Sequence, residues 1–127
     1  MIVMTSNKIL QLHKFLMQET GGLDGLRDAA LLESAVQSPL ATFDGQELYP
    51  RIKEKAAKLG YTLVKNHAFI DGNKRIGVYC MLIFLDVNGV EMIYSDDDLI
   101  ALGLGLADGS FNYENVLDWI EQHKRTC

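Results

Sequence analysis

Two side chains near the middle of the chain have types and a spacing that suit the transfer of a group from a nucleotide to a hydroxyl. Histidine changes its charge near neutral pH, so His67 can accept the proton of a Ser or Thr hydroxyl as a phosphoryl group arrives. Asp71, four residues later, offers the hard oxygen ligand that Mg²⁺ prefers. We therefore expect His67 to be a general base and Asp71 to be a metal ligand.

The residues that follow Asp71 suit the binding of phosphate. Gly72 lets the backbone approach a ligand closely, and Lys74 and Arg75 supply positive charge where a transferring group needs it. If a helix begins near Asn73, its first N–H groups and the positive end of its dipole also face the anion. Asn73 itself either bridges the loop or donates to the phosphates.

Each of these residues also has an ordinary explanation. A histidine at a helix end is usually a core residue, and an aspartate beside a glycine usually forms a turn. His67 and Asp71 would also fit a transition-metal pair, but no third His or Cys lies nearby in the sequence. All these residue types together favour a role in catalysis and phosphate binding over the ordinary explanations. Phe69, which lies between them, is expected to anchor the loop in the core.

Apolar periodicity predicts an all-α fold, a compact bundle of six helices. The fourth helix is apolar nearly all round, so we place it at the centre of the bundle. Pro39 is expected to close the second helix and Asn88-Gly89 the fourth. No segment predicts a pair of strands, and residues 90–94 are the only extended candidate. The helices are expected to begin at or near Ser6, Asp28, Pro50, Asn73, Ser95 and Asn112.

The spacing of apolar residues also predicts which helix faces are buried. The first helix is expected to bury Ile9, Leu12 and Leu16. In the third helix, the apolar line of Ile52, Ala56, Leu59 and Leu63 reaches His67 after four more residues, so His67 is expected on the buried side. The solvated face of that helix is expected to carry Lys53, Lys55 and Lys58.

Length, charge and cysteine content narrow the class of protein. The 127 residues, with a net charge of −5, are expected to form one domain over residues 1–127 that is not a general nucleic-acid binder. Cys80 and Cys127 do not make a disulfide framework, and the N-terminus does not have the pattern of a secretory signal. The apolar run at residues 76–85 is too short to cross a bilayer. We expect a cytoplasmic protein with no membrane partner.

In order, His67-x-Phe69-x-Asp71-Gly72-Asn73-Lys74-Arg75 resembles the signature of the Fic/Doc family, in its Doc (death-on-curing) form. The resemblance covers roughly residues 9 to 122. It extends to Gly21-Gly22-x-x-Gly25, Leu31 to Ala35 with Pro39, Leu48-Tyr49-Pro50, Ala56-Ala57 and Phe84-Leu85-x-x-Asn88-Gly89.

The resemblance implies the toxin of a type II toxin–antitoxin pair, which a Phd-like antitoxin inhibits. Fic enzymes transfer AMP to hydroxyl side chains, whereas Doc toxins are protein kinases that phosphorylate a threonine of elongation factor Tu. ATP and Mg²⁺ are the implied cofactors. The resemblance assigns catalysis to His67, Asp71 and Lys74, nucleotide binding to Gly72, Asn73, Lys74 and Arg75, and metal binding to Asp71.

Three positions separate this chain from the AMP-transferring Fic proteins. Where those proteins have Pro, Gly and a second Arg, this chain has Ala68, Lys74 and Val78. The resemblance therefore favours a kinase, with an AMP transferase or a non-catalytic module that binds an antitoxin or another protein as the alternatives. Lys65 stands where some Doc relatives have Arg, and a Lys lacks the two-point contact that Arg makes with phosphate.

Two further segments bear on regulation and on target binding. Residues 110–115 fit the loose pattern by which many Fic proteins inhibit themselves, but they fall where Doc proteins begin their last helix, so we expect inhibition by the antitoxin instead. Residues 38–49 form the longest non-helical stretch. In Fic relatives the corresponding flap pairs with the target through backbone hydrogen bonds, so we expect Thr42 and Phe43 to border the active site.

Overall fold

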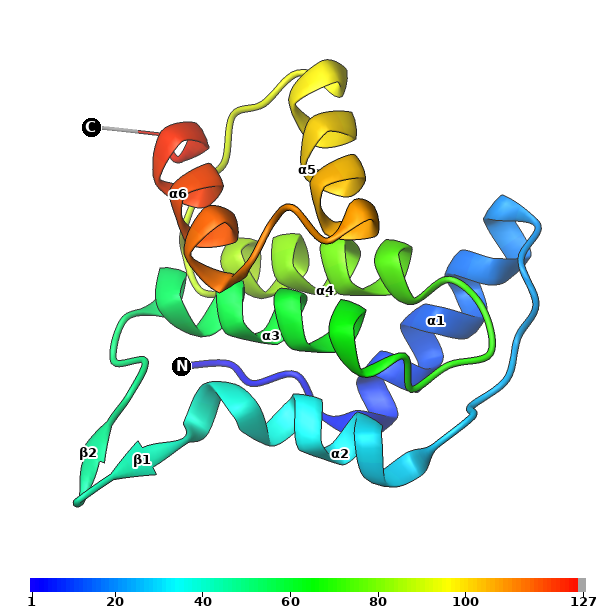
Figure 1. The fold of residues 1–127 in the computed structure, drawn as a ribbon, viewed down its shortest axis with the longest axis horizontal. Helices are drawn as coiled ribbons and strands as arrows, with labels where there is room; N and C mark the ends of the chain where they lie inside the picture. Colours follow the sequence, from blue (N-terminus) through cyan, green and yellow to red (C-terminus); the bar gives the residue numbers. More distant parts are fainter. Residues whose placement is uncertain (126–127) are drawn as a thin grey trace.

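The structure is a computed structural model that describes residues 1–125 and confirms the expected six-helix, all-α architecture (Figure 1). Its helices are α1 (Ser6–Thr20), α2 (Ala29–Gln37), α3 (Ile52–Asn66), α4 (Asn73–Val87), α5 (Asp96–Asp108) and α6 (Tyr113–His123). Between α2 and α3 lie a short 3₁₀ helix, η1 (Ser38–Leu40), and a hairpin of β1 (Thr42–Phe43) and β2 (Gln46–Glu47).

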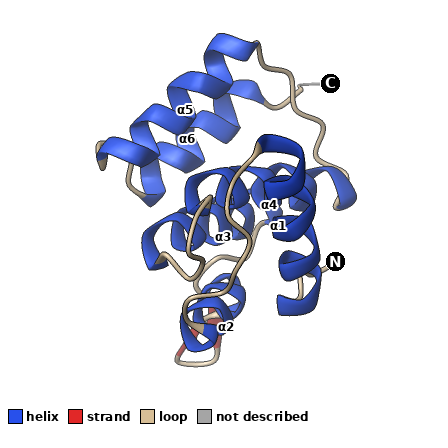
Figure 2. Ribbon diagram, turned by 90° about the vertical axis from the view of Figure 1, so that its right-hand side faces the viewer, coloured by secondary structure: helices blue, strands red, loops and turns tan. Residues whose placement is uncertain are grey.

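The antiparallel pair of α3 and α4 is the centre of the molecule, as was expected of the fourth helix. α1 packs against α4 and α2 packs against α3, while α5 contacts both central helices and α6 contacts α3. Figure 2 shows α5 and α6 on one side of the central pair and α2 on the opposite side. The loop of residues 67–72 joins α3 to α4 at the end of the bundle where the connection between α1 and α2 also runs (Figure 1). The residues predicted to do chemistry therefore lie at one end of the central helix pair.

Two glycines let the central helices approach closely. A Cβ at Gly77 of α4 would lie 2.5 Å from Val64 Cγ2 and 2.8 Å from the carbonyl oxygen of Gly60 in α3. Around this contact, α4 buries Ile76, Cys80, Met81, Phe84 and Leu85. The close crossing fixes the ends of both helices, and so it fixes the two ends of the loop between them.

Local capping signals placed most helix ends correctly. Asp28, Ser95 and Asn112 are the N-caps of α2, α5 and α6, and Asn88 is the C-cap of α4 with Gly89 at φ +83°. Two predicted starts were wrong. Thr5, not Ser6, caps α1 through its hydroxyl, and α3 begins at Ile52, two residues after Pro50, with Arg51 as its N-cap.

The expectation that no pair of strands forms was wrong, because β1 and β2 pair at residues 42–47. The turn between them places Asp44 and Gly45 at positive φ, as a tight hairpin turn requires. This hairpin precedes the first turn of α3, whereas His67 follows its last turn. Fifteen helical residues at about 1.5 Å each put roughly 20 Å between them. Figure 1 shows the hairpin and the α3–α4 loop at opposite ends of α3, so the expectation that Thr42 and Phe43 border the active site was also wrong.

Lys55 does not belong to a solvated face, contrary to expectation. Its side chain is 3% exposed, and its ammonium donates to the Glu47 carboxylate at 2.8 Å and to the carbonyl oxygens of Tyr49 and Pro39. These bonds tie the base of the hairpin to α3. Among residues 1–125, no helix is both long and apolar enough to span a membrane.

Candidate active site

His67 is exposed, and not buried as the apolar line of α3 predicted. It is the C-cap of α3 and adopts the left-handed conformation, with φ 51° and ψ 49°. A left-handed residue ends the helical repeat, so the side chain leaves the line that runs through Leu63. The Nε of Arg27 donates to the carbonyl oxygen of His67 at 2.7 Å and helps to hold this backbone conformation.

The loop after His67 is held by strand-like pairing with the connection between α1 and α2. The N–H groups of Arg27 and Asp28 donate to the carbonyl oxygen of Ala68, at 2.7 and 3.0 Å. The Ile70 N–H donates to the Gly25 carbonyl at 3.0 Å, and a bridge joins residues 26 and 69 between these bonds. Two segments about forty residues apart in the chain therefore form one rigid backbone frame.

Asn73 bridges the loop, which was one of the two roles expected for it. Its Oδ1 accepts from the Phe69 N–H at 3.0 Å, and its Nδ2 donates to the Phe69 carbonyl at 2.9 Å. Phe69 itself is 2% exposed, which confirms it as a core anchor. Because both ends of the Asn73 side chain are bonded to Phe69, the side chain serves to hold the loop, and the Asn73 backbone N–H lies at the start of α4.

The start of α4 presents backbone N–H groups that no side chain caps. Gly72 occupies the N-cap position in the left-handed conformation, φ 76°, and has no side chain to accept from the first turn. The N–H groups of Asn73, Lys74 and Arg75 are therefore the unsatisfied donors of a helix N-terminus. Together with the helix dipole they make a site that suits an anion.

The Asp71 carboxylate stands beside these donors and is held in place by the backbone. Its Oδ2 accepts from the Leu23 N–H at 3.0 Å and its Oδ1 accepts from the Gly72 N–H at 2.8 Å. These two bonds, the Leu23 bond first, lower the pKa of Asp71 below its usual value, with a smaller contribution from the Arg75 guanidinium. The Asp71 carboxylate is therefore ionised at neutral pH and held in a fixed orientation.

The two cations of the motif lie on one side of the α4 start. The Arg75 guanidinium donates to Thr20 Oγ1 at 2.5 Å and lies 3.5 Å from Asp71 Oδ1. The Lys74 side chain is exposed, and its methylene groups run towards Gly103 of α5. Both cations border a largely apolar pocket of about 370 Å³ between α1, α4 and α5.

His13 is a residue of this site that sequence reasoning missed. It is fully buried in α1, its ring stacks on Phe69 with the centroids 3.8 Å apart, and its Nε2 donates to the carbonyl oxygen of Asp71 at 2.8 Å. Its Nδ1 has no hydrogen-bond partner and lies 3.5 Å from the Asp24 carboxylate. The buried face of α1 is Ile9, His13 and Met17, and Leu12 and Leu16 are only partly buried. The spacing of four residues from Ile9 was the available signal, but a histidine does not count as apolar.

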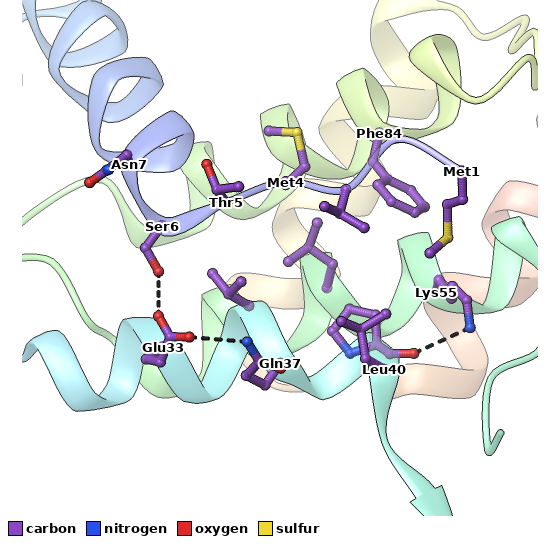
Figure 3. A pocket seen from close by; sticks show the side chains of 14 residues that line it. Met1, Met4, Thr5, Ser6, Asn7, Glu33, Gln37, Leu40, Lys55 and Phe84 are labelled. Atoms are coloured by element: carbon purple, nitrogen blue, oxygen red, sulfur yellow. Dashed lines mark hydrogen bonds between the residues drawn. The ribbon is translucent and has the colours of Figure 1, made fainter. Parts of the chain in front are cut away.

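His67 borders a different pocket from the cations. That pocket has a volume of about 290 Å³ and lies between the last turns of α3 and the connection from α5 to α6. A third pocket, of about 310 Å³, lies at the other end of the central helices, between the N-terminal segment, α2 and η1 (Figure 3). Ser6 and Gln37 donate to Glu33 at its edge, and none of the motif residues lines it. The motif therefore lies between the first two pockets.

The geometry of the α4 start fits a magnesium-bound phosphate. A Cβ at Gly22 would lie 3.0 Å from Asp71 Oδ2 and 2.9 Å from Arg75 Nη2, so the absent side chain keeps these groups accessible. Asp71 would hold Mg²⁺ through one carboxylate, which is common where phosphate oxygens and water complete the octahedron. Within residues 1–125, no three His, Cys, Asp or Glu side chains gather as a metal-binding group.

The chain belongs to the Fic/DOC family, whose family model matches residues 3–85. That range includes α1, the paired backbone frame, His67 and the start of α4. The chain is similar to Toxin Doc of Mycolicibacterium smegmatis, with 46% identity over 72 residues that cover 57% of this chain and 55% of that protein. It is also similar to Protein kinase doc of Escherichia phage P1, with 28% identity over 115 residues that cover 91% of this chain and 90% of that protein.

Proposed function

We propose that this chain is a Doc-type toxin that transfers the γ-phosphate of ATP to a Ser or Thr hydroxyl of a protein. The observation that carries the proposal is the arrangement at the α3–α4 loop. An exposed histidine, His67, precedes an uncapped helix start at which Asp71, Lys74 and Arg75 gather. The names of the two relatives, a toxin and a protein kinase, support the same class of activity.

In this proposal the nucleotide phosphates lie against the first turn of α4. The N–H groups of residues 73–75 and the side chains of Lys74 and Arg75 balance the phosphate charge. Mg²⁺ held by Asp71 and by phosphate oxygens would offset the negative charge of the β- and γ-phosphates. His67 takes the acceptor proton while the hydroxyl oxygen forms a bond to the γ-phosphorus, the bond from the γ-phosphorus to the bridging oxygen breaks, and ADP leaves.

The proposed protein substrate is elongation factor Tu, and the proposed regulator is a Phd-like antitoxin. The apolar pocket between α1, α4 and α5 suits an apolar antitoxin segment that carries an acidic residue. Ile100 and Leu104 on its rim are 57% and 60% exposed, and Lys74 and Arg75 stand at its edge. An antitoxin bound there would cover the two cations and so compete with the nucleotide phosphates. Charge complementarity favours this occupant, because none of the Asp and Glu side chains within residues 1–125 lines the pocket.

ATP labelled on either the α- or the γ-phosphate tests the reaction. The purified chain is mixed with elongation factor Tu, and the amount of label incorporated into the factor is measured. The γ label is expected on the factor, and His67→Ala is expected to reduce its transfer by about 10²-fold or more. His123→Ala in α6 is the matched control and should transfer normally. Transfer of the α label would identify an AMP transferase, and no transfer of either label would leave only the binding role.

Expression in a bacterial host tests the toxin and antitoxin roles. The wild-type chain should arrest growth, the His67→Ala variant should not, and co-expression of the cognate antitoxin should restore growth. Ile100→Arg should make the toxin resistant to the antitoxin, whereas Phe43→Arg, at a hairpin residue that is 75% exposed, should remain inhibited. A harmless wild-type chain that becomes toxic when Glu114 is replaced would show self-inhibition and would refute the antitoxin proposal.

A further inference from the structure

The pocket beside His67 has a composition unlike that of the pocket beside the cations. Of the residues that the structure describes, Lys65 is the one Lys or Arg that lines it, and no Asp or Glu of that range does. The Lys65 ammonium stands 5.6 Å above the centre of the Tyr61 ring, which holds the charge at the rim. Its lining residues are Tyr61, Val64, Lys65, His67, Leu106, Gly109, Phe111 and Asn112.

The loop has two sides. One carries Asp71 and Arg75, where we place the phosphates, and the other carries His67, the proposed base. Asp71 is bonded to Leu23, and Arg75 is bonded to Thr20, so both groups lie towards α1 and its connection to α2. The pocket that Lys74 and Arg75 border shares no lining residue with the pocket that His67 borders. A general base has to touch the hydroxyl that it deprotonates, and an acceptor bound in the pocket that His67 borders can reach it.

The hairpin cannot supply this docking surface, because α3 separates it from His67 by roughly 20 Å. The pocket beside His67 is instead a concave, half-apolar surface, with Leu106 and Phe111 among its lining. Phe111 is wedged against Gly105, where a side chain on the glycine would overlap the ring. The Phe111 ring is therefore held in one position, and a rigid apolar surface suits the positioning of an extended peptide.

We propose that this pocket binds the acceptor segment of the protein substrate, and that Lys65 pairs with an Asp or Glu next to the phosphorylated Ser or Thr. The inference rests on the proposed phosphotransfer and assigns its substrate class. A negative charge suits this pocket because Lys65 makes its rim positive and no Asp or Glu of residues 1–125 lines it. An acidic neighbour thereby places the acceptor hydroxyl at His67, while the nucleotide occupies the opposite side of the loop.

A charge exchange between Lys65 and the acceptor tests the proposal. Two peptides are compared, one with Asp and one with Lys next to a single Thr, each with the wild-type chain and with Lys65→Glu. Lys58→Glu, two turns earlier on α3, is the matched control. The wild-type chain should prefer the Asp peptide by about two- to fivefold in kcat/KM, as expected for an exposed ion pair, and Lys65→Glu should reverse the preference. Lys58→Glu should leave the preference unchanged.

The KM for ATP separates the remaining outcomes. It should be the same for the wild-type chain and for Lys65→Glu, because the nucleotide lies on the other side of the loop. A rise in the KM for ATP, with equal loss for both peptides, would place the nucleotide in this pocket and overturn the proposal. An unchanged peptide preference in an active Lys65→Glu variant would overturn it as well. If the wild-type chain transfers no γ label to either peptide or to elongation factor Tu, the proposed phosphotransfer fails, and this inference fails with it.

Discussion

Replacing His13 should disable the site without unfolding the chain, because this side chain donates a hydrogen bond to the backbone carbonyl of Asp71 and so fixes the position of that residue. The Nε2–H bond to the Asp71 carbonyl is 2.8 Å long and belongs to a ring that is fully buried. His13→Leu fills most of the space but leaves the carbonyl without its donor. An unsatisfied carbonyl costs about 1–3 kcal/mol, and the lost stacking on Phe69 adds roughly 0.5–1.5 kcal/mol.

A pair of amide variants separates positioning from simple packing. Gln at position 13 places an N–H close to the position of the ring Nε2, whereas Asn places it nearer the ring Nδ1. His13→Gln should therefore recover much of the activity, and His13→Asn should resemble His13→Leu. If about 1.4 kcal/mol of the loss falls on the alignment of Asp71, kcat should differ about tenfold between the Gln and Leu variants.

Phosphotransfer rates, urea unfolding and amide hydrogen exchange together provide the assay. The exchange of the Ile70 and Phe69 amides should accelerate in the Leu and Asn variants and remain slow in the Gln variant, because these amides report the paired frame of the loop. Equal kcat values in folded Gln and Asn variants would refute the positioning role. A Leu variant with wild-type kcat and wild-type exchange would refute it more directly.

Three further predictions concern the stability and reactivity of the fold. Gly77→Ala should lower the free energy of unfolding in urea by about 1–3 kcal/mol and reduce the rate of phosphotransfer, because its Cβ would lie 2.5 Å from Val64 Cγ2. An unchanged free energy of unfolding would contradict the close helix crossing. The lowered pKa of Asp71 stabilises the folded state above about pH 3.8, and this contribution is lost as the pH falls through the folded pKa. Asp71→Asn should therefore make the free energy of unfolding depend less on pH at acid pH. The same pH dependence in the variant and in the wild-type chain would refute this contribution of Asp71. Burial raises the pKa of Cys80 to about 12, so in a Cys127→Ser background a thiol reagent should label only the unfolded chain.

The parts of the structure that could be predicted from the sequence are those that local chemistry decides. The caps at Asp28, Ser95 and Asn112 act within one turn of helix, so the residue type and the spacing identify them. Likewise the start of α4 could be predicted from Gly72, which stands four residues before the apolar run that begins at Ile76. The anion-binding part of the candidate site was therefore foreseeable, although the binding of nucleotide and metal there remains a proposal.

The parts that could not be predicted depend on contacts between distant segments. Lys55 is buried because Glu47 and two carbonyl groups surround its ammonium, and a helical pattern does not reveal such partners. The same holds for His13, whose partner Asp71 lies 58 residues away. Periodicity wrongly assigned Lys55 to the solvated face of α3, and it left His13 out of the buried face of α1.

The exposure of His67 shows why helical periodicity has to be combined with the contacts between distant segments. Helical continuation would carry its side chain along the line of Leu63 into the core, and one left-handed residue prevents this. For a residue other than glycine this conformation costs about 1–2 kcal/mol, so the surroundings must favour it. Arg27 does so by donating to the carbonyl oxygens of His67 and Asn66, at 2.7 and 3.3 Å. The His67 side chain therefore faces solvent because a side chain from the connection between α1 and α2 fixes the end of α3, and the same connection supplies the Leu23 N–H that orients Asp71.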